Sequence, residues 1–307
     1  MWIADHWKDY EILDASGGER LERWGDYILV RPDPQVIWQT EKKDRRWKSA
    51  NAVYHRKNTG GGSWEIRQLP ETWDITYPAG RLGAVPDPAA DGNDVYRFRL
   101  KPFSFKHTGL FPEQAANWDW FSGLIRTAKE KNGGRQVRVL NLFAYTGGAT
   151  VAAAMAGAAV THVDAARGMV TWAHENAALS GLADAPIRYL VDDCGKFVDR
   201  EIRRGNRYDA VILDPPSYGR GPKGEIWKLE DELHGLLHRC ASLLSDDPVF
   251  FLLNSYTTGL APGVLSYLLS DVLCGRECRI ESEEVGLPVK TSPVPLPCGA
   301  SGRVVFF

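Results

Sequence analysis

Four apolar runs of the chain are each followed closely by glycines or acidic residues, which are residue types that can contact a bound nucleoside. Residues beyond the carboxyl ends of parallel strands meet at one edge of a sheet, and open α/β sheets bind their ligands at that edge. If the four runs are neighbouring strands, their spacing predicts a single site made from four loops. The runs are residues 137–142, 159–163, 187–191 and 208–213, and they lead to Gly147 and Gly148, Asp164, Asp192 and Asp193, and Asp214, respectively.

The first loop begins at Asn141 and ends in the glycine pair. Glycine lets the backbone N–H groups at a helix N-terminus approach a ligand closely. The loop lacks the third glycine of the dinucleotide-binding pattern and offers aromatic and hydroxyl side chains instead. It therefore favours a nucleoside without phosphates, such as adenosine linked to methionine, although an ordinary strand-to-helix turn would have similar glycines. The residues expected to contact this ligand are Asn141, Phe143, Ala144, Tyr145, Thr146, Gly147 and Gly148.

Acidic residues after the second and third runs suit the two polar ends of an adenosine. Asp164, which precedes Ala165, can accept both ribose hydroxyls, because a carboxylate offers two oxygens to a vicinal diol. Asp192 and Asp193 can accept the adenine amino group while a neighbouring backbone amide donates to the ring. Each of these acids could also cap a helix, so the prediction depends on the four loops together.

The fourth run leads into Asp214, Pro215 and Pro216, with Tyr218 just beyond. Prolines make a loop rigid, so that its carbonyl oxygens can face outward as acceptors. The Asp214 carboxylate adds another acceptor, and Tyr218 offers a face on which a base could stack. This combination indicates a catalytic loop, and a simple proline turn would not account for the other three loops.

Together these residues resemble class I S-adenosylmethionine-dependent methyltransferases, in particular those that form 5-methylcytosine or 7-methylguanine in large-subunit ribosomal RNA. The resemblance covers about residues 95–307 and includes the segment 106–114, which precedes the first loop. It implies S-adenosyl-L-methionine as the cofactor, with Phe111 and Gln114 among its contacts. The segment departs from the family pattern at His107, Glu113 and Ala115, which puts its detailed contacts in doubt.

The cysteine content bears on which atom is methylated. Carbon 5 of a pyrimidine becomes nucleophilic only after a cysteine thiolate adds to the neighbouring carbon, and no cysteine follows Asp214 in the fourth loop. In related 5-methylcytosine enzymes, the residues after the fifth strand look like Ser-Cys-Ser. This chain has Asn254-Ser255-Tyr256 at that place. Cys194 is expected to be a small buried residue. A base nitrogen is therefore the predicted acceptor, and 5-methylcytosine formation is the alternative.

The elements that must position these loops alternate between strands and helices from residue 137 onward. This pattern predicts an α/β fold with a seven-stranded, mostly parallel, doubly wound (Rossmann-like) methyltransferase sheet. Trp- and Tyr-rich runs beside glycines predict a β-rich N-terminal domain over residues 1–100, before a methyltransferase domain over 101–307. The remaining strands are expected at 249–253, 277–285 and 303–307, and helices at 148–156, 169–180 and 229–244.

Basic residues gather at three places that could contact RNA phosphates, and one of these is the cluster of Arg203, Arg204 and Arg207. Each cluster alone is also typical of a solvated protein face. RNA, ribosomal RNA above all, is the predicted partner, while a protein or small-molecule acceptor stays open. A non-catalytic RNA-binding protein that keeps the methyltransferase fold is the rival of a different class, and the missing glycine disfavours a nicotinamide oxidoreductase. The candidate substrate-binding residues are Lys42, Lys43, Arg45 and Arg46, and Arg220 with Lys223 beside the fourth loop.

The composition of the 307 residues sets the remaining expectations. A formal net charge of −2 argues against a protein that coats nucleic acid nonspecifically. The five cysteines have no zinc-site spacing, so reduced thiols and no metal are expected. The chain starts without the apolar core of a signal peptide, and its apolar runs are too short to span a bilayer. A cytoplasmic protein that does not enter a membrane is therefore predicted, with its oligomeric state open.

Overall fold

A computed structural model gives the fold of the chain. It describes residues 1–57, 61–79, 95–103, 106–131, 133–221, 224–257 and 259–307. No helix in these residues is long and apolar enough to cross a membrane.

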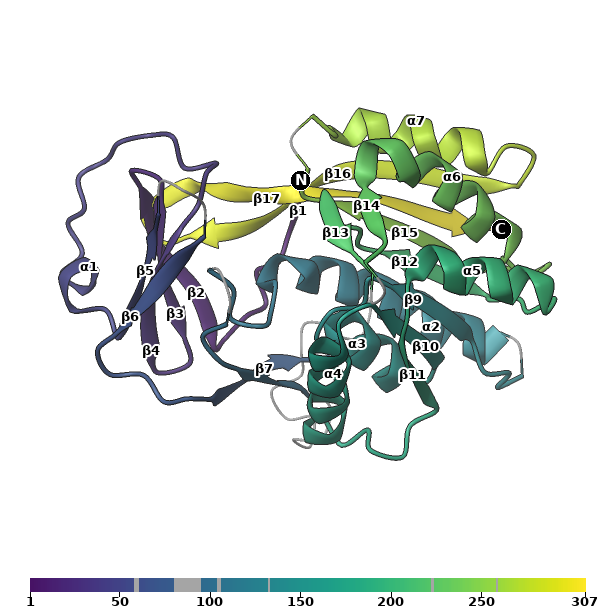
Figure 1. Cartoon of the computed structure of the whole chain (residues 1–307), viewed down its shortest axis with the longest axis horizontal. Coiled ribbons are helices and arrows are strands. Elements are labelled where there is room, and N and C mark those ends of the chain that lie inside the picture. The colour runs from purple at the N-terminus through teal and green to yellow at the C-terminus, as the bar shows by residue number, and fades with distance from the viewer. Residues whose placement is uncertain (58–60, 80–94, 104–105, 132, 222–223, 258) are drawn as a thin grey trace.

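Seven strands form the central sheet in the order β11-β10-β9-β12-β15-β17-β16 (Figure 1). The strands from β11 to β15 are parallel, and β17 runs antiparallel to both of its neighbours. The predicted mostly parallel Rossmann-like sheet is confirmed. The strands are β9 (Arg138–Leu142), β10 (Ala159–Asp164), β11 (Ile187–Val191), β12 (Ala210–Leu213), β15 (Phe250–Ser255), β16 (Cys278–Val289) and β17 (Ser292–Phe306).

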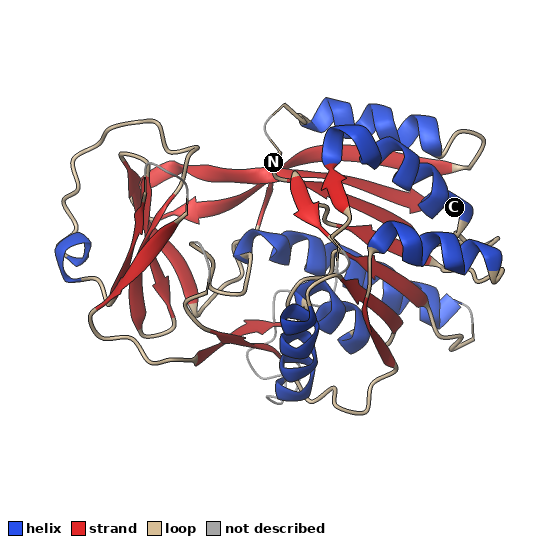
Figure 2. Cartoon of the chain, viewed as in Figure 1, coloured by secondary structure: helices blue, strands red, loops and turns tan. Residues whose placement is uncertain are grey.

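Helices cover both faces of this sheet because successive side chains of a strand point to opposite sides (Figure 2). Val139 and Ile212 belong to one apolar core with residues of α2, α3 and α4. Leu140 and Val211 belong to a second core with residues of α5, α6 and α7. The helices are α2 (Ala115–Lys131), α3 (Gly148–Met155), α4 (Arg167–Leu179), α5 (Cys194–Arg203), α6 (Leu229–Ser242) and α7 (Pro262–Val272), and a 3-10 turn, η1 (Pro112–Gln114), precedes α2.

The N-terminal region is β-rich, as predicted, and most of its strands extend the central sheet through both parallel and antiparallel pairings. Strands β7 and β8 make a separate pair, and the hairpin of β13 and β14 lies beside the fourth loop. The elements are β1 (Trp2–Ile3), β2 (Tyr10–Ser16), β3 (Glu19–Trp24), β4 (Tyr27–Pro32), α1 (Arg46–Ser49), β5 (Ala52–Arg56), β6 (Gly62–Ile66), β7 (Trp73–Pro78), β8 (Val95–Leu100), β13 (Tyr218–Arg220) and β14 (Ile226–Lys228).

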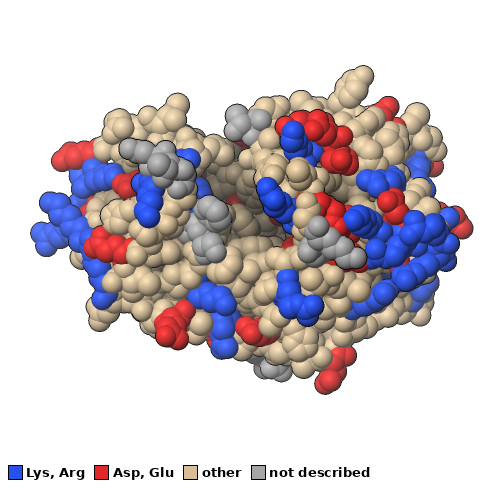
Figure 3. All heavy atoms as spheres, in the orientation of Figure 1, with Lys and Arg blue, Asp and Glu red and all other residues tan. Residues whose placement is uncertain are grey.

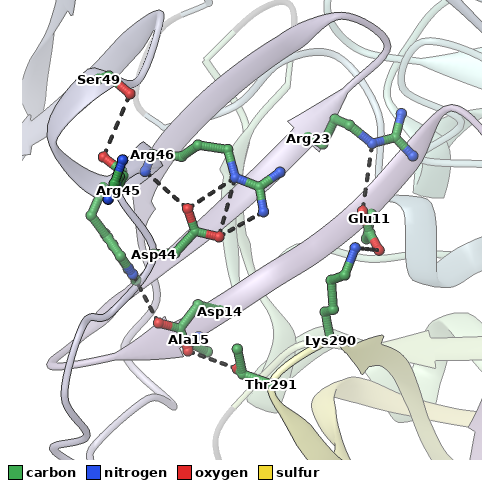
Figure 4. A network of polar contacts seen from close by, with 11 residues as sticks. Glu11, Asp14, Ala15, Arg23, Asp44, Arg45, Arg46, Ser49, Lys290 and Thr291 are labelled. Atoms are coloured by element: carbon green, nitrogen blue, oxygen red, sulfur yellow. Dashed lines mark hydrogen bonds and ion pairs between the residues drawn. The ribbon is translucent and has the colours of Figure 1, made fainter.

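The long hairpin of β16 and β17 links the two regions (Figure 1). Val289 of β16 pairs with Ile12 of β2. At the hairpin tip, Lys290 lies 3.4 Å from Glu11, and Thr291 donates to Asp14 Oδ1 at 2.8 Å (Figure 4). The sheet therefore continues into the N-terminal region, and the predicted division near residue 100 stays a prediction.

Candidate active site

A cavity of about 750 Å³ lies between the carboxyl ends of the central strands and the N-terminal region. Figure 3 shows the surface hollowed between these two parts. Four acidic residues define what we call the acidic wall, and they are Glu113, Asp164, Asp193 and Asp214. Three basic residues define the basic wall, and they are Arg20, Arg31 and Lys106. The predicted site residues that line the cavity are Phe111, Phe143, Tyr145, Asp164, Ala165, Asp193, Asp214, Pro215, Pro216 and Arg220.

The loop after β9 has an unusual backbone. Phe143 and Tyr145 adopt left-handed φ angles of 55° and 49°. Such angles cost a non-glycine residue about 1–3 kcal/mol and occur most often at functional sites. The loop is held by Thr146 Oγ1, which donates to the Gly109 carbonyl at 2.5 Å, and by Asn176, which donates to the Thr146 carbonyl at 2.8 Å. The strained loop therefore presents two aromatic rings to the cavity.

Asp164 at the end of β10 holds the same loop. Its Oδ2 accepts the Tyr145 N–H and its Oδ1 accepts the Ala166 N–H, both at 2.8 Å. Burial raises the pKa of this carboxyl, and the two backbone donors counteract the rise. Each carboxylate oxygen keeps a second lone pair, so Asp164 can accept two ribose hydroxyls while it supports the loop.

The glycine pair lets α3 begin close to its neighbours. Gly147 has a φ of 84°, and a Cβ there would lie 2.8 Å from the Ala173 Cβ. A Cβ on Gly148 would lie 2.8 Å from the Trp118 ring. Neither glycine lines the main cavity. The pair instead lets the backbone at the start of α3 pack closely against Ala173 and Trp118.

Besides Gly148, four predicted cofactor residues that do not line the main cavity lie around a smaller pocket of about 50 Å³. Asn141 is buried and donates to Thr150 Oγ1 at 2.9 Å. Gln114 donates to the Tyr256 hydroxyl at 2.7 Å. Asn141 and Gln114 therefore hydrogen-bond to neighbouring side chains and do not line the main cavity. The four residues are Gln114, Asn141, Ala144 and Thr146.

The two acids after β11 have different neighbours. Asp193 caps α5, because its side chain accepts the Lys196 N–H at 2.9 Å, and it also lines the cavity. Asp192 forms an ion pair with Arg200 and does not line the cavity. The structure therefore brings Asp193, but not Asp192, to the cavity, and its contact with adenine stays a prediction.

Asp214 lies at the end of β12 in a partly buried position. Burial, together with the nearby Glu113, raises its pKa to about 7. Glu113 is 3% exposed, and its Oε2 has no hydrogen-bond partner in the part of the chain that the structure describes. Burial raises the pKa of Glu113 as well. The half-buried Tyr256 ring lies 5.5 Å from Phe111. Asp214 of the catalytic loop thus lies near a second carboxyl, and the pKa values of both groups are raised.

The prolines of this loop are braced by the hairpin of β13 and β14. Trp227 donates to the Pro216 carbonyl at 2.6 Å, so the Pro216 carbonyl oxygen already accepts one hydrogen bond within the protein. The Trp227 ring also lines the cavity and lies 5.0 Å from Phe143. Tyr218 is 54% exposed and does not line the cavity, so its stacking on a base stays a prediction.

Two cysteines line the cavity, Cys194 and Cys298. Cys194 is buried, as expected, and its sulfur accepts the Phe143 N–H at 3.3 Å. Cys298 comes from β17 and was not anticipated. Burial raises the pKa of both thiols well above the usual value. Neither thiol is therefore prepared to act as a thiolate nucleophile.

The predicted basic cluster lies far along the N-terminal region and does not line the cavity. Lys42 pairs with Glu19 at 2.5 Å, and Lys43 pairs with Glu41 at 3.3 Å. Figure 4 shows the ion pair of Arg46 with Asp44, at 2.6 Å. Arg45 flanks α1 in the same segment. Lys223 lies outside the described residues. RNA binding by these residues stays a prediction.

Several cavity residues carry no local sequence signal. Side chains from antiparallel strands and from the hairpin of β13 and β14 also line the cavity. Only the tertiary fold brings these segments to the site. Away from it, His234, His238 and Asp271 form an exposed group with metal-ligand chemistry, so the expected absence of a metal stays a prediction. The cavity residues that the sequence did not single out include Arg20, Arg31, Trp227 and Cys298.

Comparison with known proteins shows what the chain is similar to. Over its whole length it resembles the crystal structure of a SAM-dependent methyltransferase from Agrobacterium tumefaciens, with 33% identity, a TM-score of 0.86, and coverage of 99% of this chain and 95% of that one. A methyltransferase structure from Streptococcus mutans shares the fold at 18% identity and a TM-score of 0.69, over 97% of this chain and 75% of that one.

Curated relatives match a shorter part of the chain. "Ribosomal RNA large subunit methyltransferase K/L" of Shewanella baltica (strain OS155) is 35% identical over 151 residues, which are 48% of this chain and 20% of the relative. The same protein of Shewanella sp. (strain MR-4) is 34% identical over 131 residues, which are 42% and 17%. The chain thus spans about a fifth of the length of these relatives.

The cavity suits the cofactor that these proteins use. Asp164 offers the paired acceptors for a ribose, aromatic rings flank the loop, and the volume lies within the range of small-molecule sites. When bound, S-adenosyl-L-methionine supplies a methyl group on a positively charged sulfur. Residues 88–259 match the sequence profile of the S-adenosylmethionine-dependent methyltransferases. With more than half of its length inside that match, the chain belongs to this family of enzymes.

Proposed function

We propose that the chain methylates RNA, with ribosomal RNA the favoured substrate and a base nitrogen the acceptor atom. The names of the Shewanella relatives support the substrate class. The observation that carries the proposal is the position of Asp214, which lines the cavity beside Glu113. A carboxylate at this place can hold an N–H group of a base in line with the methyl donor.

Different cavity residues have different roles in the proposed reaction. Asp214 accepts an N–H of the target base, which orients the nitrogen lone pair and offsets the positive charge that forms there. Pro215 supports this acceptor from a rigid loop. Trp227 and Phe143 exclude water from one side. Because the reaction is a displacement at carbon, exact positioning and charge stabilisation supply most of the rate.

The cysteines support nitrogen over carbon as the acceptor. Carbon 5 of cytosine needs a thiolate to attack the neighbouring carbon. Both cavity cysteines are buried, and this burial raises their thiol pKa values. A nitrogen acceptor needs no covalent step, and the acidic wall provides the acceptors that it requires.

Transfer of a labelled methyl group from the cofactor to ribosomal RNA tests the proposal. RNA from cells lacking the gene is incubated with the enzyme, digested to nucleosides and analysed by mass spectrometry. We expect a base methylated on nitrogen, and no product with Asp214→Ala. A 5-methylcytosine product would overturn the nitrogen assignment, and an active enzyme that labels only protein would overturn the RNA assignment. The cytoplasm is the proposed location of this reaction.

A further inference from the structure

We propose that the N-terminal sheet is part of the active site, where the basic wall binds an oxyanion in the cavity. This oxyanion is a backbone phosphate of the substrate or the carboxylate of the cofactor's methionine. Only the first source rests on the proposed function. Arg20 comes from β3, Arg31 from β4, and Lys106 from the segment before η1.

Arg31 serves as the structural member of the basic wall. It is 2% exposed, and it donates to both oxygens of Glu22 at 2.6 and 2.7 Å. It also donates to the Lys106 carbonyl at 3.0 Å. This bidentate ion pair fixes the guanidinium, so Arg31 ties the segment with Lys106 to the N-terminal sheet.

Arg20 is buried without equivalent partners. It is 8% exposed, its Nε lies 3.2 Å from Glu22 Oε1, and its Nη1 lies 3.5 Å from Asp33 Oδ2. The Nε has no partner with hydrogen-bond geometry among the described residues. Buried charged side chains are normally paired and hydrogen-bonded. Arg20 therefore lines the cavity with donor capacity left for a ligand.

Lys106 adds a cation that has only a neutral partner. Its Nζ donates to the Pro32 carbonyl at 3.0 Å. Burial, and then the charge of Arg20, lower its pKa to about 8. The two carboxylates in contact with the basic wall, Glu22 and Asp33, face three cations. One of the three cations therefore has no carboxylate in ion-pair contact, and an oxyanion could pair with it.

Two variants test the site without breaking the Arg31 ion pair. Lys106→Met keeps the aliphatic stem and removes the charge, and Arg20→Gln keeps a polar side chain. The matched control is Lys8→Met, which removes an exposed lysine of the same region. Inorganic phosphate is the probe, titrated against chloride at equal ionic strength with and without saturating S-adenosylhomocysteine. Calorimetry gives the Kd of S-adenosylmethionine for each variant, and circular dichroism checks the fold.

We expect both variants to weaken oxyanion binding by about tenfold or more, while the control binds like the natural chain. If phosphate binds beside S-adenosylhomocysteine and the variants keep their S-adenosylmethionine affinity, the oxyanion is a substrate phosphate. If phosphate competes with S-adenosylhomocysteine and the variants bind S-adenosylmethionine more weakly, it is the cofactor carboxylate. Folded variants with unchanged affinity for both ligands would overturn the site. Neither readout uses RNA, so this outcome is separate from failure of the proposed function.

Discussion

The two walls of the cavity are built in different ways. Asp164, Asp193 and Asp214 of the acidic wall follow strands of the parallel sheet, while Glu113 lies in η1. Asp164 and Asp193 are oriented by backbone N–H groups within a few residues of themselves or in the adjacent loop. Arg20 and Arg31 of the basic wall come from antiparallel strands, and Arg31 also contacts the distant Lys106. The acidic wall thus has a local origin, whereas the basic wall exists only in the folded chain.

The largest effect should follow from a change in the acidic wall. Asp214→Ala removes the acceptor that orients the target base, and we expect kcat to fall by about 10²- to 10⁴-fold. Single-turnover methyl transfer measures this loss. Asp184→Asn, on an exposed residue, is the control. A rate within a few-fold of the natural chain would show that Asp214 does not touch the reacting base.

Asp164→Ala should act on cofactor binding. The ribose loses a charged acceptor, and the Tyr145 N–H loses its partner, so we expect the Kd of S-adenosylmethionine to rise about tenfold to a hundredfold. Calorimetry measures the change. Asp164→Asn, which keeps one acceptor oxygen, should show a smaller rise. Equal affinity in all three proteins would contradict the ribose assignment.

The carboxyl pair should give the reaction a pH dependence. Asp214 is a much stronger N–H acceptor when ionised than when protonated, and its pKa is raised from 3.8 to about 7. Activity should therefore fall as the pH drops below about 7 and level off above it. Glu113→Gln removes a neighbouring negative charge, so the Asp214 pKa should fall and the midpoint should move to lower pH. A midpoint that stays in place, in a variant that still binds the cofactor, would contradict the coupling.

The smallest effect is expected from the exposed basic cluster. Lys42, Lys43 and Arg46 each have a carboxylate partner, and exposed ion pairs contribute little. Replacing these three and Arg45 with alanine should change salt-dependent retention on RNA by less than about twofold. Lys106→Met serves as the comparison. A large loss from the fourfold variant would move the RNA path to this outer surface.

The sequence was sufficient for the parallel sheet and for most of the acidic wall. Apolar periodicity marks strands, and the residues that follow parallel strands must meet at one edge. The sequence was insufficient where a residue reaches its position only because its strand pairs with another segment of the chain. The start of β17 at Ser292 follows from its long hairpin with β16, and Trp227 reaches the cavity because β13 and β14 pair beside it. Tyr256 and Glu113 meet at the cavity from segments far apart in the chain.

A crystal structure with S-adenosylhomocysteine would test the central claim most directly. The account predicts ribose hydroxyls on the Asp164 carboxylate, adenine near Asp193, and the sulfur turned toward Asp214. A ligand bound elsewhere, or bound in this cavity with its ribose away from Asp164, would contradict it.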